Sequence, residues 1–583
     1  MKRPLLLAAM LFMGMIIGHG QAENTRFTNP EVLPILQGDY DPADYRASVI
    51  IDDPGVIFQK LVDEINPDSL KSYLEALSTF ENRNTGSDTL SDQRGIGAAQ
   101  RWCYRKFESF SQNREDRLES TYLVFDQNIC GMGRHKNVIS VLPGQGAQKE
   151  EVIVVLAHLD SRCADRCGTD CLAQGMEDNG SGSALVLELA RVMSQFTFNR
   201  TVVFMLTTGE EQGLHGARAF ADYCTEQNVN VYAAYNNDIV GGVICGETAS
   251  PPGCPYLNHI DSVNVRVYSA GGTRSKFKML ARFIEREYNT HLAPIMDFAH
   301  VVNIMTPEDR TGRGGDHIPF RENRFATVRF SSANEHGDGN PSQPGYHDRQ
   351  HTREDVLGVD TDGDNVIDSF FVHFNYLSRN AMINAGAITS SALGPIPVAD
   401  FQVEEQIGGF SISIDDPNNY GKYLVGVKRL GQNVFDTTYI IETTVDTLPV
   451  KSPFWYYINV ATLDSNNVQS HFCLERDVRI QTTGTEDLLI QSGVQLLQNY
   501  PNPFDDATTI AVVVNEYIKY NDAEIRIFDE SGVQLAVLPI TLDKGSNEVI
   551  YSYRNHEYKP GVYRYGLWVD GKRIDMKSMV YAY

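Results

Sequence analysis

The residues best suited to chemistry lie in five short segments of this 583-residue chain, and each segment places His, Asp or Glu where a hydrophobic strand ends or a Gly-rich turn begins. The segments are centred on His158, Asp178, the pair Glu210-Glu211, Asp238 and His351. Nitrogen and oxygen donors of this kind hold zinc and leave a coordination position open for water. In open α/β sheets, reactive groups gather beyond the carboxyl ends of the strands. The segments therefore predict a hydrolytic metal site.

Each segment also has a structural explanation that needs no metal. A histidine such as His158 is often structural, Asp178 lies in a turn where it could cap the next helix, and paired glutamates are usually solvated. Their position favours the metal interpretation, because each lies at a strand end or a Gly-rich turn. Asp160, two residues after His158, can hydrogen-bond the second ring nitrogen of that histidine and fix its orientation. Glu210 and Glu211 can point differently, so that one binds metal while the other moves protons.

The elements that must position these residues alternate between β-branched runs and helical periodicity over residues 29–391, which predicts an α/β domain. Buried strands are expected at 137–142, 152–157, 201–206, 231–236, 263–268 and 326–330. Helices are expected at 92–107, 183–195, 213–223, 275–288 and 370–388. The chain is too long for one core, so we expect further domains.

After Gly394-Pro395-Ile396-Pro397 the composition changes to short alternating strands and turns, which predicts all-β structure. Within 396–482, the strand at 456–462 and the turn Ser465-Asn466-Asn467 resemble the last hairpin of a fibronectin type III domain. The simplest role of such a domain is that of a spacer.

The last stretch, 488–583, contains Gln498-Asn499-Tyr500-Pro501-Asn502-Pro503-Phe504 and, near its end, Gly561-Val562-Tyr563. Both runs resemble the C-terminal sorting domain of proteins exported by type IX secretion. The resemblance implies an immunoglobulin-like β-sandwich that the outer-membrane secretion machinery recognises and that is often removed afterwards. The residues alone predict only a β-sandwich that ends in a hydrophobic strand.

The N-terminus has the pattern of a secretory signal peptide over residues 1–22: Lys2 and Arg3, an apolar run at 5–17, and small residues up to Ala22. The apolar run is too short to span a bilayer comfortably, and no later stretch is long and uncharged enough for a membrane helix. The formal net charge of −25 argues against a nucleic-acid partner. We therefore expect a secreted or cell-surface protein without a transmembrane helix in the mature chain.

Nine cysteines in an exported chain predict disulfides, with an odd count leaving one thiol unpaired. A short loop link such as Cys245 to Cys254 is the default expectation. The regular spacing of Cys163, Cys167 and Cys171 could instead suggest a thiolate metal site, but an oxidising compartment favours disulfides.

Because they contain the five segments described above, residues 80–388 resemble the co-catalytic zinc aminopeptidases. This family includes glutamate carboxypeptidases and has the glutaminyl cyclases as near relatives. The resemblance implies a three-layer domain over 23–395, with a mixed central sheet and helices on both faces, two zinc ions, and peptide or protein substrates. It assigns His158 and Asp238 to one zinc, Glu211 and His351 to the other, Asp178 to both as a bridge, and the role of general base to Glu210.

The last ligand has to be chosen between two histidines, His347 and His351. His351 is preferred because His351-Thr352-Arg353-Glu354-Asp355 reproduces the family's His-Thr-x-x-Asp element. Asp316 and His317, in Gly314-Gly315-Asp316-His317, belong to another family element and are expected to support the ligands or contact substrate rather than bind metal.

An acidic run between the site and the last helix resembles half of a calcium loop. It places Asp360, Asp362, Asp364 and Asp368 at alternating positions, but it lacks the closing Glu and has Asn where Gly is preferred. Calcium is one interpretation, and a solvated loop is the other.

The function that these observations favour is a secreted zinc exopeptidase, most simply an aminopeptidase. A carboxypeptidase of the same fold and a glutaminyl cyclase-like enzyme with one zinc are alternatives, although the bridging Asp178 favours the peptidases. A non-catalytic adhesin would be expected to have lost a ligand or the base, and no such loss is seen. No G-x-S-x-G or H-E-x-x-H motif points to another hydrolytic scheme.

Overall fold

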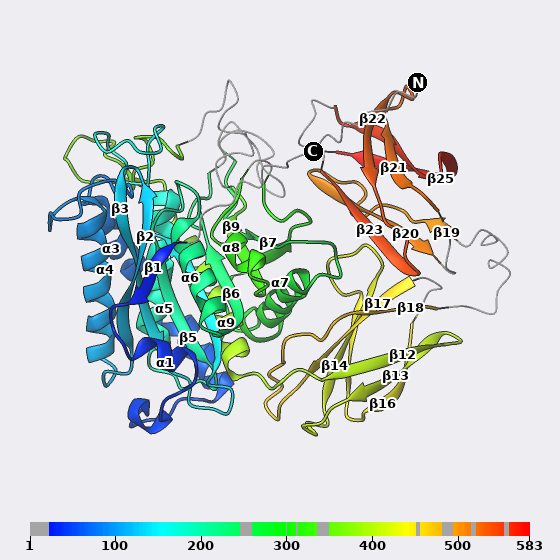
Figure 1. Cartoon of the computed structure of the whole chain (residues 1–583), viewed down its shortest axis with the longest axis horizontal. Helices are drawn as coiled ribbons and strands as arrows, with labels where there is room; N and C mark the ends of the chain where they lie inside the picture. Colours follow the sequence, from blue (N-terminus) through cyan, green and yellow to red (C-terminus); the bar gives the residue numbers. More distant parts are fainter. Residues whose placement is uncertain are drawn as a thin grey trace, which may run out of the picture.

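A nine-stranded mixed sheet forms the centre of the first part of the molecule in the computed structural model (Figure 1). The structure describes residues 22–244, 259–298, 300–310, 313–334, 349–450, 455–480, 494–514, 520–552 and 559–582. In spatial order the strands are β1 (Glu23–Phe27), β2 (Glu119–Ile129), β3 (Met132–Leu142), β5 (Thr201–Thr207), β4 (Glu151–His158), β6 (Asn230–Asn237), β9 (Thr327–Ser332), β7 (Asn264–Tyr268) and β8 (Val301–Ile304). The strands β5, β4, β6 and β9 run parallel, whereas β1, β2 and β3 join the sheet antiparallel.

Helices cover both faces of this sheet. One face packs against α2 (Pro54–Glu64), α3 (Pro67–Ser78), α4 (Gly95–Gln112), α5 (Ser181–Met193), α7 (Lys276–Glu287) and α9 (Phe374–Leu393). The other face packs against α1 (Val32–Leu36), α6 (His215–Glu226) and α8 (His317–Glu322). In β4, Ile153 and Val155 face the first set and Val152 and Val154 the second, because side chains alternate along a strand. The predicted three-layer α/β fold is confirmed.

All predicted strands and helices of this part form, with shifted ends; for example, the helix predicted at 213–223 begins at His215 and the one at 370–388 is α9. The elements β1, β2, β8, α1, α2, α3 and α8 were not predicted individually. Signals for two of them were present. Asp53 and Asn66 accept hydrogen bonds as N-caps, and Pro54 and Pro67 occupy the first positions of α2 and α3.

Two all-β parts follow, each with three strands in one sheet and four in another. The first has β12 (Asp400–Gln406), β13 (Gly409–Asp415) and β16 (Val445–Pro449) in one sheet, and β15 (Thr437–Ile441), β14 (Tyr423–Arg429), β17 (Trp455–Thr462) and β18 (Arg476–Arg479) in the other. In the second part, one sheet consists of β19 (Val494–Leu496), β20 (Ala507–Val514) and β23 (Gly545–Ser552). The other sheet consists of β22 (Gln534–Pro539), β21 (Ala523–Phe528), β24 (Gly561–Val569) and β25 (Lys572–Tyr581). Each part has its own apolar core. A short hairpin, β10 (Gly358–Val359) and β11 (Ser369–Phe370), precedes α9.

The three parts meet at a junction that buries charged side chains. Arg282 of α7 donates to Glu475 at 2.7 Å, and Lys428 of β14 lies 3.2 Å from the same carboxylate. Glu548 of β23 accepts hydrogen bonds from Thr273 and from Tyr457 of β17. Each of these charges therefore has a partner, and the contacts of Glu475 with Arg282 and of Glu548 with Thr273 and Tyr457 cross between parts.

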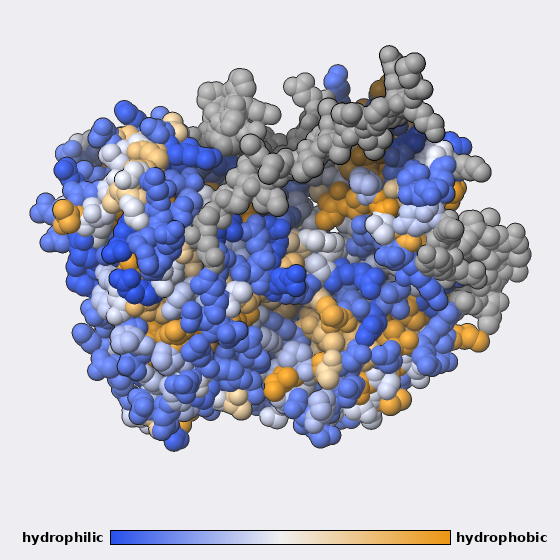
Figure 2. Space-filling view, in the orientation of Figure 1, coloured by the Kyte–Doolittle hydropathy of each residue, from blue (hydrophilic) through white to orange (hydrophobic). Residues whose placement is uncertain are grey.

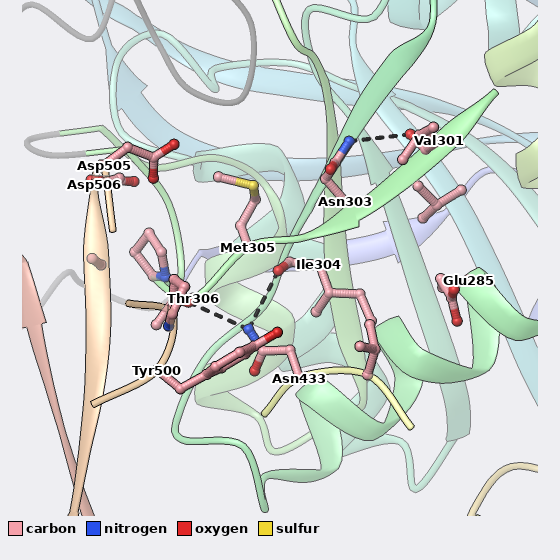
Figure 3. A pocket seen from close by; sticks show the side chains of 15 residues that line it. Glu285, Val301, Asn303, Ile304, Met305, Thr306, Asn433, Tyr500, Asp505 and Asp506 are labelled. Carbon is pink, nitrogen blue, oxygen red and sulfur yellow. Dashed lines mark hydrogen bonds between the residues drawn. The ribbon is translucent and has the colours of Figure 1, made fainter. Parts of the chain in front are cut away.

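A cavity of about 430 Å³ also lies at this junction. Figure 3 shows the end of β8 on one side and Tyr500, Asp505 and Asp506 on the other, with Asn433 donating to the backbone of Ile304 and to Thr306. Its lining contains no histidine or cysteine.

The cysteines confirm the expected disulfides and correct the expected number of free thiols. Cys163 pairs with Cys171 and Cys130 with Cys167, which rules out a thiolate metal site at Cys163, Cys167 and Cys171. Cys103, Cys224 and Cys473 are unpaired, so the expectation of one free thiol is wrong. The first two are fully buried in apolar cores, where cysteine serves as a small hydrophobic residue. Cys245 and Cys254 lie outside the described residues, as does all of the expected signal peptide except Ala22.

The surface in Figure 2 is mainly hydrophilic, with its larger hydrophobic patches toward the side where the two all-β parts lie in Figure 1. Among the described residues, no helix combines the length and apolar character needed to cross a bilayer.

Candidate metal centre

Four of the predicted site residues lie at the ends of three neighbouring parallel strands, at one edge of the sheet. His158 is the last residue of β4, Glu210 and Glu211 follow β5, and Asp238 follows β6. Because β4 lies between β5 and β6 and all three run parallel, these side chains emerge side by side. Asp178 reaches the same edge from the turn before α5.

The Asp178 carboxylate lies between two imidazoles. Its Oδ1 is 3.1 Å from Nε2 of His158, and its Oδ2 is 3.1 Å from Nε2 of His351. Nε2 of His158 also lies 3.6 Å from Asp238, and Nε2 of His351 lies 3.2 Å from Glu211. The Asp178 carboxylate thus lies between His158 and Asp238 on one side and His351 and Glu211 on the other. His351 joins the site, whereas His347 lies outside the described residues.

The donor set fits zinc. Within the described chain, the ligand atoms of His158, Glu210 and Asp238 lie within 4.8 Å of one another, and so do those of Asp178, Glu211 and His351. Two buried polar atoms, Oε1 of Glu211 and Nδ1 of His351, have no hydrogen-bond partner among the described residues. Imidazole and carboxylate donors are those that zinc uses in hydrolytic sites.

The electrostatics of the site require positive charge. Burial alone would lower the pKa of His158, but the carboxylates of Glu210, Asp178 and Asp238 raise it well above its usual value. Against the same burial, Glu211 and Asp178 raise the pKa of His351 to about 9. Carboxylates this close repel one another unless cations lie between them. Divalent metal ions meet that requirement without protonating the imidazoles.

Asp160 bonds the second ring nitrogen of His158, as predicted, and does so through its backbone oxygen. Nδ1 of His158 lies 3.0 Å from the backbone oxygen of Asp160, whereas the nearer carboxylate oxygen is 3.8 Å away. The backbone carbonyl therefore fixes the tautomer that leaves Nε2 for a metal. The carboxylate instead accepts hydrogen bonds from the backbone N–H groups of Glu210 and Glu211, each at 3.3 Å, and from Thr85. Asp160 thus positions the glutamate pair.

The turn that carries Asp178 is held by the segment that carries His351. Both carboxylate oxygens of Asp355 accept backbone hydrogen bonds from this turn, from Glu177 at 2.8 Å and from Asp178 at 3.0 Å. Asp355 is the last residue of the His-Thr-x-x-Asp element. This element therefore supplies one ligand and orients another.

Asp316 and His317 lie behind the ligands. Oγ1 of Thr207, at the end of β5, donates to the Asp316 carboxylate, and burial raises the pKa of Asp316 to about 7. Nε2 of His317 lies 3.9 Å from Asp309. The preceding Gly315 passes so close to Asp238 that a Cβ there would lie 3.1 Å from Oδ2. This segment therefore packs against a ligand without supplying one.

The acidic loop at 360–368 shows no independent sign of a cation. Asp360, Asp362 and Asp368 come together, and Asp364 lies outside that group. Their carboxylates accept hydrogen bonds from the loop itself, as with Asp360 from Gly363 and Asn365. Calcium stays a prediction from sequence.

Arg83 is a site residue that the sequence gives no reason to select. It is fully buried, and its guanidinium donates to the backbone oxygens of Leu159, Gln174 and Gly175. It thereby ties both ends of the 159–175 loop together. Arg83 is 75 residues before His158, and no spacing rule links them.

A cavity of about 490 Å³ opens over the ligands. Besides the six site residues, its lining consists of Arg162, Ala164, Arg166, Gly213, Leu214, Ile239, Arg310, Arg313, Gly314, Arg329 and Gln350. Its volume is in the range typical of small-ligand sites.

Known proteins with similar sequences agree with this centre. Residues 137–249, which contain five of the six site residues, match the model of peptidase family M28. A probable zinc metalloprotease of Pyricularia oryzae is 30% identical over 366 residues, which cover 60% of this chain and 69% of that protein. A probable zinc metalloprotease of Pyrenophora tritici-repentis is 25% identical over 437 residues, which cover 71% and 93%.

Solved structures with similar folds include the LapA aminopeptidase of Legionella pneumophila, with a TM-score of 0.41 and 20% identity over 57% of this chain and 73% of that one. The glutaminyl cyclase of Porphyromonas gingivalis gives a TM-score of 0.38 and 14% identity over 55% and 97%. On the sequence matches, which extend over most of the length of a relative at 30% identity, this chain belongs to peptidase family M28 and is a zinc metallopeptidase.

Proposed function

We propose that this protein is an exopeptidase with two zinc ions that removes residues from the amino end of peptides. The observation that carries the proposal is the Asp178 carboxylate, whose two oxygens each lie 3.1 Å from a different histidine. One carboxylate between two nitrogen donors suits a bridging ligand between two metal ions.

In this proposal His158 and Asp238 would hold one zinc, Glu211 and His351 would hold the other, and Asp178 would serve both. Zinc at these positions would polarise the peptide carbonyl and make a water molecule more acidic. Arg329 lies 3.2 Å from Asp238 and Arg162 lies 3.8 Å from Glu211, so each of these ligand carboxylates is also held from behind by a guanidinium.

Glu210 is proposed as the general base. It takes a proton from the attacking water and passes it to the nitrogen of the leaving amine. Burial and neighbouring carboxylates, only partly offset by His158, raise the pKa of Glu210 well above its usual value. A group that first accepts this proton and then donates it requires a pKa closer to neutrality than that of a free carboxylate. The hydrogen bonds from the glutamate pair to Asp160 fix the turn that presents Glu210.

The preference for the amino end rests on the resemblance of the five segments to zinc aminopeptidases. A glutaminyl cyclase uses one metal, so the shared position of Asp178 favours the peptidase. Export by the N-terminal signal and outer-membrane secretion through the C-terminal part are proposed on the sequence patterns at 1–22 and 498–504.

The test uses the purified protein and three substrate types. Zinc is counted per chain, and hydrolysis is measured on aminoacyl p-nitroanilides, on N-acetylated peptides with a free carboxyl end, and on peptides with N-terminal Gln. We expect two zinc ions, chelator-sensitive release of p-nitroaniline and little action on the blocked peptides. Cleavage of only the blocked peptides would identify a carboxypeptidase, and ammonia release from the Gln peptides would identify a cyclase.

A further inference from the structure

The walls of the metal cavity carry charge of one sign. Apart from the six ligand and base residues, every charged residue in its described lining is an arginine: Arg162, Arg166, Arg310, Arg313 and Arg329. This is the opposite of the chain as a whole, whose formal net charge is −25. The arginines of this lining therefore differ from the general composition of the chain and need a local explanation.

Two of these arginines are occupied by the ligands. Arg329 is fully buried and lies 3.2 Å from Asp238 and 2.5 Å from Asp309. Arg162 lies 3.8 Å from Glu211 and donates to the backbone oxygens of Cys163 and Ala164. These two support the metal centre.

Arg310 adds positive charge beside Arg329. Its Nε lies 3.7 Å from Asp309, so two guanidinium groups share this carboxylate. Although burial raises the pKa of Asp309, Arg329, His317 and Arg310 lower it to about 2, which keeps it ionised. Asp309 therefore holds Arg310 beside Arg329 in the lining of the cavity.

Arg166 stands on a loop that is fixed at several points. The disulfides Cys163–Cys171 and Cys130–Cys167 clamp the loop, and the backbone oxygen of Arg166 accepts hydrogen bonds from Asn84 and Gln212, each at 2.8 Å. Arg166 is an exposed residue, and within the described chain no carboxylate forms a salt bridge with it. Its backbone is thus held in place while its charge remains available to a ligand.

We propose that Arg166, which lines the cavity together with Arg310 and Arg313, binds a carboxylate of the substrate next to the scissile bond and makes acidic substrates the preferred class. This deepens the proposed function and rests on it. Guanidinium groups suit the purpose, because they pair with carboxylates through two parallel hydrogen bonds. The carboxylate can come from an acidic side chain or from the free carboxyl end of a short peptide.

The hydrolysis test compares substrates that differ only in one carboxylate. The first arm compares glutamyl with glutaminyl p-nitroanilide, and the second compares Leu-Gly with its C-terminal amide. We expect kcat/KM to favour the carboxylate by about 10- to 100-fold in one arm, the range of one hydrogen bond to a charged group. The arm that shows the preference identifies the source of the carboxylate.

Arg166→Gln should reduce that ratio at least tenfold. The matched control is Arg105→Gln, the same substitution at an exposed position of α4, which should leave the ratio unchanged. An unchanged ratio in Arg166→Gln, or the absence of any preference in both arms of the wild type, would overturn the proposal.

A binding measurement separates this proposal from the proposed function. Calorimetry of the zinc-loaded protein with L-glutamate and L-glutamine compares two probes with the same amino and carboxyl groups, so that a difference reports the side chain. If the recognised carboxylate is that of an acidic side chain, we expect glutamate to bind about tenfold more tightly than glutamine. This difference should be lost in Arg166→Gln. Carboxylate-selective binding without hydrolysis of any substrate would defeat the proposed function alone, and hydrolysis without carboxylate preference would defeat the arginine proposal alone.

Discussion

The metal cavity and the three-part junction both bury charged side chains, but they balance those charges in different ways. At the junction, Glu475 pairs with Arg282 at 2.7 Å and with Lys428 at 3.2 Å, so the charges neutralise one another. In the metal cavity, four carboxylates surround two imidazoles, and Oε1 of Glu211 has no partner among the described residues. The first arrangement is complete without a ligand, whereas the second needs cations.

The contrast separates stability from function. A buried charge that loses its only partner destabilises the fold, whereas a set of converging carboxylates that gains metal becomes a reactive centre. Changes at the junction should therefore lower the free energy of unfolding and leave the chemistry intact, and changes in the cavity should do the reverse.

The largest effect is expected from Asp178→Asn. Replacing one oxygen by an NH₂ group removes the bridge and puts a donor where a metal would lie, so we expect zinc to fall below one ion per chain and hydrolysis to become undetectable. Elemental analysis after dialysis measures the metal. Two retained zinc ions would show that Asp178 is not a bridging ligand.

Glu210→Gln should keep both zinc ions and lower kcat by about 10²- to 10⁴-fold, the usual contribution of general acid–base catalysis. Stopped assays with the same p-nitroanilides measure the loss. If zinc drops to one ion per chain, Glu210 is a ligand with His158 and Asp238, which their proximity also allows. Activity close to wild type would exclude both roles.

Glu475→Gln tests the junction. It leaves Arg282 and Lys428 buried without their carboxylate, so we expect the free energy of unfolding to fall by about 3–5 kcal/mol. Denaturant unfolding measures this, and zinc content and kcat at 25 °C should not change. Asp400→Asn removes the partner of Arg476 in a surface pair and serves as the control, with an expected cost below about 1 kcal/mol. Equal costs for the two variants would contradict the account.

The smallest effect concerns pH and His471, which stacks on Tyr232 between the first two parts. Burial, together with Arg200, lowers the pKa of His471 to about 3. Between pH 6.5 and 3 the unfolded chain therefore binds a proton that the folded chain does not, so this group's stabilisation is complete above pH 6.5 and is lost as pH falls. We expect a loss of up to about 2 kcal/mol between pH 7 and pH 5. His471→Gln should show a correspondingly shallower pH dependence by denaturant unfolding, and an identical dependence would contradict the assignment.

The sequence predicted those parts of the site that local pattern controls. His158, Glu210, Glu211 and Asp238 follow apolar strands, and parallel strands end at one edge, so their convergence could be expected. His351 required a resemblance to a known motif, because its segment joins no strand of the sheet. The structure explains that motif through Asp355, which binds the Asp178 turn.

Contacts between distant segments could not be predicted. The Cys130–Cys167 disulfide joins residues 37 positions apart, and Arg83 binds a loop about 80 residues later. The arginines that line the metal cavity could not be predicted either, because Arg166 and Arg310 come from separate loops that meet only after folding. The bond between Asp160 and His158 follows from their spacing, but spacing cannot distinguish a backbone oxygen from a carboxylate.

The most direct test of the two-zinc centre is X-ray diffraction from zinc-loaded crystals at wavelengths on either side of the zinc absorption edge. The account predicts two anomalous peaks, one on each side of the Asp178 carboxylate and about 3.5–4 Å apart, with His158 and Asp238 at one and Glu211 and His351 at the other. A single peak, or zinc bound away from Asp178, would contradict it.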